Sequence, residues 1–216
     1  MATPTMAVPK TFVAGEIVAN GISAEDYLAQ YAETFHEWVE GAVIKMSPAS
    51  LRHMLLTQYL LQWLNIYFAR NPIGQVLIAP FVMRVTSIES FREPDLQVIL
   101  NENPGQLTDT GMIGPADICI EIVSPESVER DYGQKFNEYE KAGVREYWII
   151  DPIRQRCDFN RRTEAGIYSV IQPDNTGHYQ TPLLPKLALH VPTLWQEQLP
   201  DSLAIAQAVA RMVEEN

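Results

Sequence analysis

The sequence predicts an α/β or α+β fold in which helices flank a mixed central sheet. Residues 116–123 are β-branched and apolar on both faces, which is typical of a central strand in a covered sheet. Residues 51–70 and 127–142 carry apolar side chains at helical spacing. The expected elements alternate between helices and strands along the chain, which favours one mixed sheet over an all-helical or all-β architecture.

The chain has 216 residues, of which 46% are hydrophobic, enough for one domain with a sizeable core. We expect a flexible N-terminal tail over residues 1–15. A single domain should follow over residues 16–200, and a C-terminal helix over residues 201–216. The opening residues lack the apolar core of a signal peptide, and no apolar run reaches transmembrane length. These features predict a cytoplasmic protein with no membrane partner.

The formal net charge of -11 argues against a protein that coats nucleic acid through a broad basic surface. It leaves room for a nuclease whose positive charge is local to a metal ion. The two cysteines, Cys119 and Cys157, form neither a disulfide framework nor a zinc-binding spacing. We therefore expect reduced cysteines that serve packing.

In the N-terminal third, a start resembling a capping box predicts a short helix over residues 23–31. Residues 35–46 are predicted to form a hairpin that turns at Glu40-Gly41 and ends at Ser47-Pro48. The helix over residues 51–70 is the clearest element, and Asn71-Pro72 ends it.

The middle of the chain reads as strands over residues 75–79 and 81–85, separated by Pro80. A further strand over residues 94–100 begins at its proline, and residues 101–115 are predicted to be a polar loop. After the strand over 116–123, the helix over 127–142 should end at Gly143. The remaining expected elements are a strand at 144–151, short β segments around 157–159, 167–171 and 187–190, and an amphipathic helix at 201–215.

Glu121 does not fit its surroundings, because it stands between Ile120 and Ile122 near the end of an apolar strand. A buried, ionised carboxylate without a partner costs several kcal/mol. A metal ion, a lysine or a raised pKa could compensate it, or the strand end could emerge into water.

Asp95 also lies in an otherwise apolar strand, and two carboxylates on adjacent strands can hold a hard divalent cation. The ordinary alternative for Asp95 is a Pro-Asp turn at the start of a strand.

Lys135 follows on the next helix, beside an aromatic stripe that should pack on the sheet, so its ammonium group could reach the end of the strand. The alternative is a surface pair with Asp131, four residues earlier. Glu37 in the hairpin and Glu40 at its turn are candidates for a third acid, although solvent-exposed carboxylates are the default for both. His53, near the start of the long helix, is either a ligand or a capping or packing residue.

Together these residues resemble the Uma2-like family of the PD-(D/E)XK nuclease superfamily, over residues 20 to 190. The resemblance is strongest from Glu121 to Pro152. The matching segments are His36-Glu-Trp-Val-Glu-Gly41, Met46-Ser-Pro48, His53, Pro94-Asp95, Glu121-Ile-Val-Ser-Pro125, Asp131-Tyr-Gly-Gln-Lys135 and Gly143-Val-Arg-Glu-Tyr-Trp-Ile-Ile-Asp-Pro152.

The superfamily motif places a lysine two residues after the glutamate, where this chain has Val123. The resemblance implies that Lys135 on the following helix takes that role. It also implies a restriction-endonuclease-like fold, and Glu37, with Glu40 as competitor, as the additional acid.

The function implied by the resemblance is metal-dependent cleavage of phosphodiester bonds in nucleic acid, with DNA the expected substrate. Asp95, Glu121 and the backbone carbonyl of Ile122 would hold Mg²⁺ or Mn²⁺. Lys135 would position or deprotonate the attacking water, and Glu37 would bind the metal through water or hold a second ion. Arg52, His53 and Lys45 are candidates for the DNA cleft.

Two alternatives stay open at the level of sequence. The chain could be a catalytically silent binding or scaffold protein with the nuclease fold, since the strand lysine and a basic groove are missing. It could also hydrolyse a phosphoester outside nucleic acids. The resemblance further suggests a homodimer, formed through the C-terminal β segments or an aromatic surface around Trp148 and Trp195.

Overall fold

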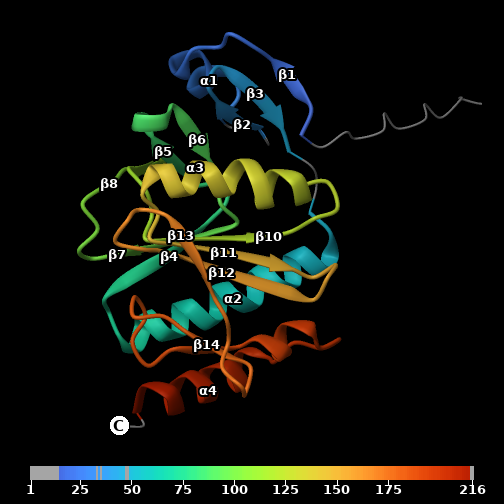
Figure 1. The fold of residues 1–216 in the computed structure, drawn as a ribbon, viewed down its shortest axis with the longest axis vertical. Helices are drawn as coiled ribbons and strands as arrows, with labels where there is room; N and C mark the ends of the chain where they lie inside the picture. Colours follow the sequence, from blue (N-terminus) through green and yellow to red (C-terminus); the bar gives the residue numbers. More distant parts are fainter. Residues whose placement is uncertain (1–14, 33, 35, 47–48, 215–216) are drawn as a thin grey trace, which may run out of the picture.

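The computed structural model describes residues 15–32, 34, 36–46 and 49–214 (Figure 1). Fourteen of the fifteen residues of the predicted tail lie outside the described residues, as does the predicted hairpin end at Ser47-Pro48.

A six-stranded mixed sheet forms the centre of the molecule and confirms the predicted fold class. Its middle strand is β10 (Ile118–Ile122), which pairs antiparallel with β7 (Leu96–Leu100) and parallel with β11 (Glu146–Asp151). The strand order is β13-β12-β11-β10-β7-β4. The outer strands are β4 (Gly74–Ile78), β12 (Arg156–Arg162) and β13 (Tyr168–Ile171).

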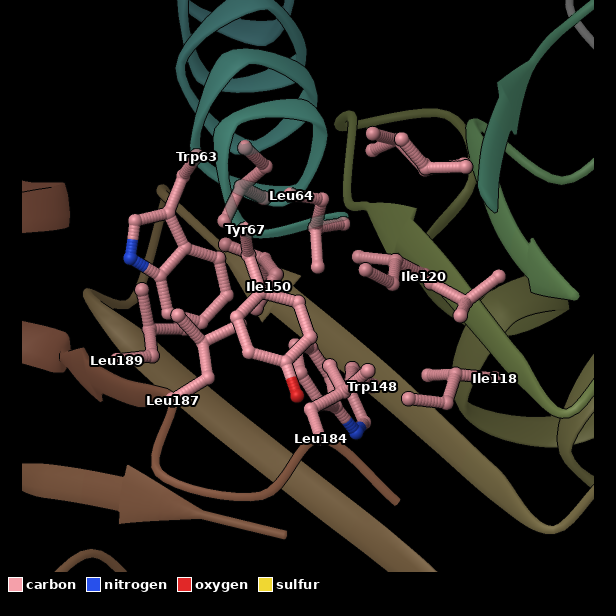
Figure 2. Packing of buried hydrophobic residues seen from close by; sticks show 14 of the residues in the cluster. Trp63, Leu64, Tyr67, Ile118, Ile120, Trp148, Ile150, Leu184, Leu187 and Leu189 are labelled. Atoms are coloured by element: carbon pink, nitrogen blue, oxygen red, sulfur yellow. The ribbon is translucent and has the colours of Figure 1, made fainter. Parts of the chain in front are cut away.

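Helices cover both faces of this sheet (Figure 1). Alternate residues of β10 point to opposite faces, so Ile118, Ile120 and Ile122 join the core formed with α2 (Leu51–Arg70). Figure 2 shows side chains of α2, including Trp63 and Leu64, meeting those of β10 in this core. The same core includes α4 (Ser202–Glu214) and the η3 turn (Val191–Trp195).

The opposite face of β10 carries Cys119 and Val123, which pack with the helix that follows the strand. This helix has two α-helical residues at 128–129, then a π-helical turn, η2 (Arg130–Gln134), and continues as α3 (Lys135–Ala142). The sequence predicted a single helix over residues 127–142, and the π-helical turn was not expected. Gly143 ends α3 with a φ of +91°, in the left-handed region that glycine tolerates.

A second sheet lies on the α3 side of the molecule (Figure 1) and has the strand order β1-β3-β2-β6-β5-β9-β8. The predicted hairpin is present as β2 (His36–Val39) and β3 (Ala42–Lys45). The predicted first helix is α1 (Ala24–Gln30), capped by Ser23. The strand predicted after Pro80 is β5 (Val82–Val85), so the break at the proline carries the chain from one sheet to the other.

Several short elements escaped prediction because two or three residues are too few to show a periodicity. The predicted polar loop over 101–115 was wrong in part, since it contains β8 (Gln106–Leu107) and β9 (Gly111–Ile113). The other short elements that were not predicted are β1 (Ile17–Ala19), η1 (Thr86–Ile88), β6 (Ser90–Arg92) and β14 (His178–Gln180). The β segment predicted around residues 187–190 is present as β15 (Ala188–His190).

Trp148 is only 1% exposed and packs inside the core against Phe159 and Tyr179. The suggested dimer surface around Trp148 was therefore wrong for that residue, because a buried side chain offers no area to a partner.

Within the described part of the chain, no helix combines the length and apolar character needed to cross a membrane.

Candidate functional site

A cavity of about 560 Å³ opens where the first turn of α2, the end of β4, the start of β7, the end of β10 and η2 meet. Carboxylates and cationic groups gather on one part of its wall, and apolar side chains form much of the rest. The lining residues that matter for the site are His53, Glu93, Asp95, Glu121, Ile122, Ser127, Arg130, Asp131 and Lys135.

Glu121 is 3% exposed and points to the face of the sheet that α3 covers. The Lys135 ammonium lies 2.8 Å from its Oε1, and the Tyr139 hydroxyl donates a hydrogen bond of 2.8 Å to the same oxygen. Burial raises the pKa of Glu121, the Lys135 charge opposes this, and the neighbouring acids raise it further. Of the compensations expected from sequence, a lysine and a raised pKa are therefore both present.

Asp95 lies just before β7 and reaches the end of the neighbouring strand. Its Oδ2 accepts a hydrogen bond of 2.7 Å from the backbone N–H of Ile122 and lies 2.9 Å from His53 Nε2. Burial alone would lower the pKa of His53, but the hydrogen bond and charge of Asp95 raise it. The contact with Ile122 places the Asp95 carboxylate beside the end of β10, next to Glu121.

The carbonyl of Ile122 faces the same side as its N–H, because both groups of a residue project to one edge of an extended strand. The register pairs Ile118 with Val98 and Ile120 with Leu96, and extending it places Pro94 opposite Ile122. Proline has no N–H to donate, so the ladder with β7 does not use this carbonyl.

Lys135 is 2% exposed and lies among three carboxylates. Besides Glu121 at 2.8 Å, its Nζ lies 3.5 Å from Glu37 Oε1 and 3.8 Å from Asp131 Oδ1. Burial would lower the pKa of Lys135, but these three negative charges raise it overall. The surface pair with Asp131 that sequence left open is thus one part of a buried cluster.

Glu37 is completely buried and does not line the cavity. Its Oε2 accepts a 2.6 Å hydrogen bond from Arg92, and its Oε1 faces Lys135 and the N–H of Glu93. Burial would raise its pKa, but Lys135 and Arg92 lower it to about 2. Both Glu37 oxygens therefore face cations of the protein, and its role toward a metal ion stays a prediction.

The remaining candidates divide between the cavity and other surfaces. His53 and Asp131 line the cavity, and the Ser127 hydroxyl donates to Asp131. Glu40 lies exposed at the hairpin turn and does not line the cavity. Two residues predicted for the cleft, Arg52 and Lys45, do not line it either, and the Arg52 guanidinium donates to the Leu194 carbonyl.

Sequence reasoning missed two charged residues of the cavity wall, Glu93 and Arg130. Glu93 is 9% exposed, and its Oε1 is buried without a hydrogen-bond partner among the described residues. Burial and the charge of Glu37 raise the pKa of Glu93 to about 8, against the opposing charge of Lys135. Its position two residues before Asp95 was the available signal.

The donors at this cavity fit a hard divalent cation that keeps several water ligands. Asp95, Glu121 and the Ile122 carbonyl supply oxygen atoms, and the buried Glu93 Oε1 has no other partner. No group of three or more His, Cys, Asp or Glu side chains within residues 15–32, 34, 36–46 and 49–214 is arranged to hold a metal ion. In proteins, Mg²⁺ usually keeps several waters and takes only one or two carboxylates.

The fold and the cavity place the chain among proteins with a restriction-endonuclease-like fold. A crystal structure from Anabaena variabilis, described as "a putative nuclease belonging to DUF820", is similar to it with a TM-score of 0.67. The match covers 81% of this chain and 97% of that one at 18% identity.

A family model named Uma2, described as "Putative restriction endonuclease", matches residues 24–192. The chain belongs to this family, as its sequence motifs predicted. No curated protein matches the chain.

Proposed function

We propose that this protein is a divalent-metal-dependent nuclease that hydrolyses phosphodiester bonds, with DNA as its substrate. One observation carries the proposal: Asp95 just before β7, Glu121 on the neighbouring β10, and Lys135 on the following helix line the same cavity. Family membership supports the nuclease class, and the choice of DNA rests on the restriction-endonuclease description of that family.

Asp95, Glu121 and the Ile122 carbonyl would hold Mg²⁺ or Mn²⁺, which would supply charge neutralisation at the phosphate and a more acidic water. His53 would keep the Asp95 carboxylate oriented, because it contacts the same oxygen as the Ile122 N–H. Orienting partners of this kind preserve the geometry of ligands.

Lys135 would hold its charge near the attacking water and stabilise the negative charge that develops on the phosphate. Its three carboxylate neighbours favour a charged ammonium, so positioning is a better role for it than accepting a proton. Glu37 would act behind Lys135 as a positioning residue, since its own contacts are with cations and not with the cavity.

Cleavage assays on supercoiled, linear and single-stranded DNA and on RNA, with Mg²⁺, Mn²⁺ or EDTA, test this function. We expect metal-dependent cleavage of DNA that falls at least about 100-fold in Asp95→Asn, Glu121→Gln and Lys135→Met. Two matched controls should keep full activity: Glu214→Gln at an exposed position and Lys141→Met on the exposed side of α3.

Intact nucleic acid under every metal condition, or full activity in Asp95→Asn, would contradict the proposal. Calorimetry with Mn²⁺ then separates the remaining possibilities. A silent scaffold should show no divalent affinity that depends on Asp95, whereas hydrolysis of a different phosphoester should leave that affinity intact.

A further inference from the structure

The guanidinium of Arg130 lies at the cavity wall, where its charge acts on the Glu37 and Asp131 carboxylates without forming an ion pair with either. Its Nε is buried and without a hydrogen bond, and no described residue forms an ion pair or side-chain hydrogen bond with its guanidinium. Lys135 and Arg92, in contrast, have three and two carboxylate partners respectively. A buried N–H without a partner is costly, so a ligand in the cavity that accepts a hydrogen bond from Arg130 Nε would relieve that cost.

The π-helical turn explains why Arg130 and Lys135 both reach this cavity. The N–H of Lys135 bonds to the carbonyl of Arg130, five residues earlier, so the two residues lie one above the other across the turn. In an α-helix, residues five apart would point in clearly different directions. The wider turn therefore brings a second cation to the side of the helix that faces the carboxylates.

The position of the guanidinium is restricted by the chain around it. A Cβ atom at Gly15 would lie only 3.2 Å from Nη1 of Arg130, so Gly15 passes close to this group. Four carboxylates, those of Glu93, Asp95, Glu121 and Asp131, share the same wall. An anionic ligand entering there needs local positive charge in addition to any bound cation.

We propose that Arg130 is the phosphate-binding residue of this cavity and contacts the oxygens of the scissile phosphoester. The planar fork of an arginine matches two phosphate oxygens at once, which a lysine cannot do. The inference rests on the proposed phosphodiester chemistry for its substrate, although phosphate binding itself can be measured without any cleavage. Lys135, held by its three acids, acts beside Arg130 and not in place of it.

Binding of inorganic phosphate in the presence of Mg²⁺, followed by calorimetry, tests the assignment. We expect Arg130→Ala to weaken phosphate binding about 10- to 100-fold. Arg130→Lys should retain part of the affinity, because it keeps the charge and loses the fork. Arg70→Ala, at the far end of α2 where Arg70 pairs with Glu214, removes an equal charge and should bind as the wild type does.

The kinetics with which the protein cleaves a labelled oligodeoxynucleotide provide a second readout. Arg130→Ala should raise KM and leave kcat nearly unchanged, since a contact that persists from the bound state into the transition state contributes equally to both. Equal phosphate affinity in wild type and Arg130→Ala, with both folded by circular dichroism, would overturn the assignment. So would a wild-type protein that binds no phosphate at all.

The two proposals fail in different ways. If the wild type cleaves nothing while Arg130→Ala still loses phosphate affinity, the nuclease function is wrong and the phosphate site stands. If the wild type cleaves DNA and Arg130→Ala matches it in cleavage and in phosphate binding, only the Arg130 assignment is wrong.

Discussion

At the scale of single residues, five buried or nearly buried charges form a chain behind the cavity. Glu138 and Glu37 flank Arg92, and Glu37 also faces Lys135, which reaches Glu121 at the cavity wall. Each buried charge has an opposite partner, which is the condition under which such groups are tolerated. The cluster fixes the position of Lys135, because the ammonium is held from both sides.

Replacing Glu37 by glutamine should destabilise the protein and do so in a pH-dependent way. Its pKa of about 2 in the folded protein lies below the ordinary value of 4.5, so its stabilisation is full above pH 4.5. That stabilisation is lost as the pH falls toward 2. We expect Glu37→Gln to cost about 3–5 kcal/mol at pH 6 and progressively less below pH 4.5.

Urea unfolding of both proteins between pH 6 and pH 3 measures this difference. Glu214→Gln, at an exposed site, should show almost no cost at either pH. A difference for Glu37→Gln that stays constant over the range would show that the carboxylate is not held in its charged form.

At the scale of elements, the π-helical turn η2 is the feature that places the cavity side chains. It carries Arg130 and Asp131 and leads directly into Lys135, and such turns recur at functional sites. Gly133 lies within the turn, and a Cβ atom there would meet no heavy atom within 4 Å. The glycine is therefore not required by packing.

Gly133→Ala should stabilise the protein by about 0.5–1 kcal/mol, because alanine loses less conformational freedom than glycine in a helix. Gly143→Ala is the matched control on the same helix. It should destabilise the protein by about 1–2 kcal/mol, because Gly143 has a φ of +91°. Thermal unfolding of the two variants measures both effects, and a loss of stability in Gly133→Ala would mean that the turn needs a glycine.

At the scale of the whole molecule, a net charge of -11 surrounds a cavity that the described residues line with two Arg or Lys side chains, Arg130 and Lys135. Proteins that bind nucleic acid through a basic surface neutralise many phosphates and lose affinity steeply with salt. A protein of this charge should instead contact few phosphates and depend on a divalent cation.

We expect a plot of log K against log salt concentration for a single-stranded oligodeoxynucleotide to have a slope of about -1 to -2. This value corresponds to about two phosphate contacts, and binding should be much weaker in EDTA. Fluorescence anisotropy with Ca²⁺ replacing Mg²⁺ measures the slope without cleavage. A slope of about -5 or steeper would indicate a broad basic surface that the described cavity does not have.

The long periodic segments were predictable from the sequence because each shows its own pattern. The helix over residues 51–70 has the predicted limits, and the central apolar strand is β10. Glu121 stood out by a local rule, since a charge in an apolar strand needs a partner. The roles of Asp95 and Lys135 came from the family resemblance, because local patterns left ordinary alternatives open for both. By itself, then, the sequence determined the fold class, the family and the three side chains around which the cavity is built.

The tertiary structure decided how those side chains are partnered. Glu37 and Glu93 are both acids near predicted strands, but Arg92 draws Glu37 behind Lys135, while Glu93 faces the cavity. Arg92 comes from a three-residue strand that no periodicity reveals, and Arg130 reaches the cavity through a π-helical turn. These placements depend on contacts between residues far apart in the chain and on one extra residue in a helical turn. Local sequence patterns contain no signal for either feature.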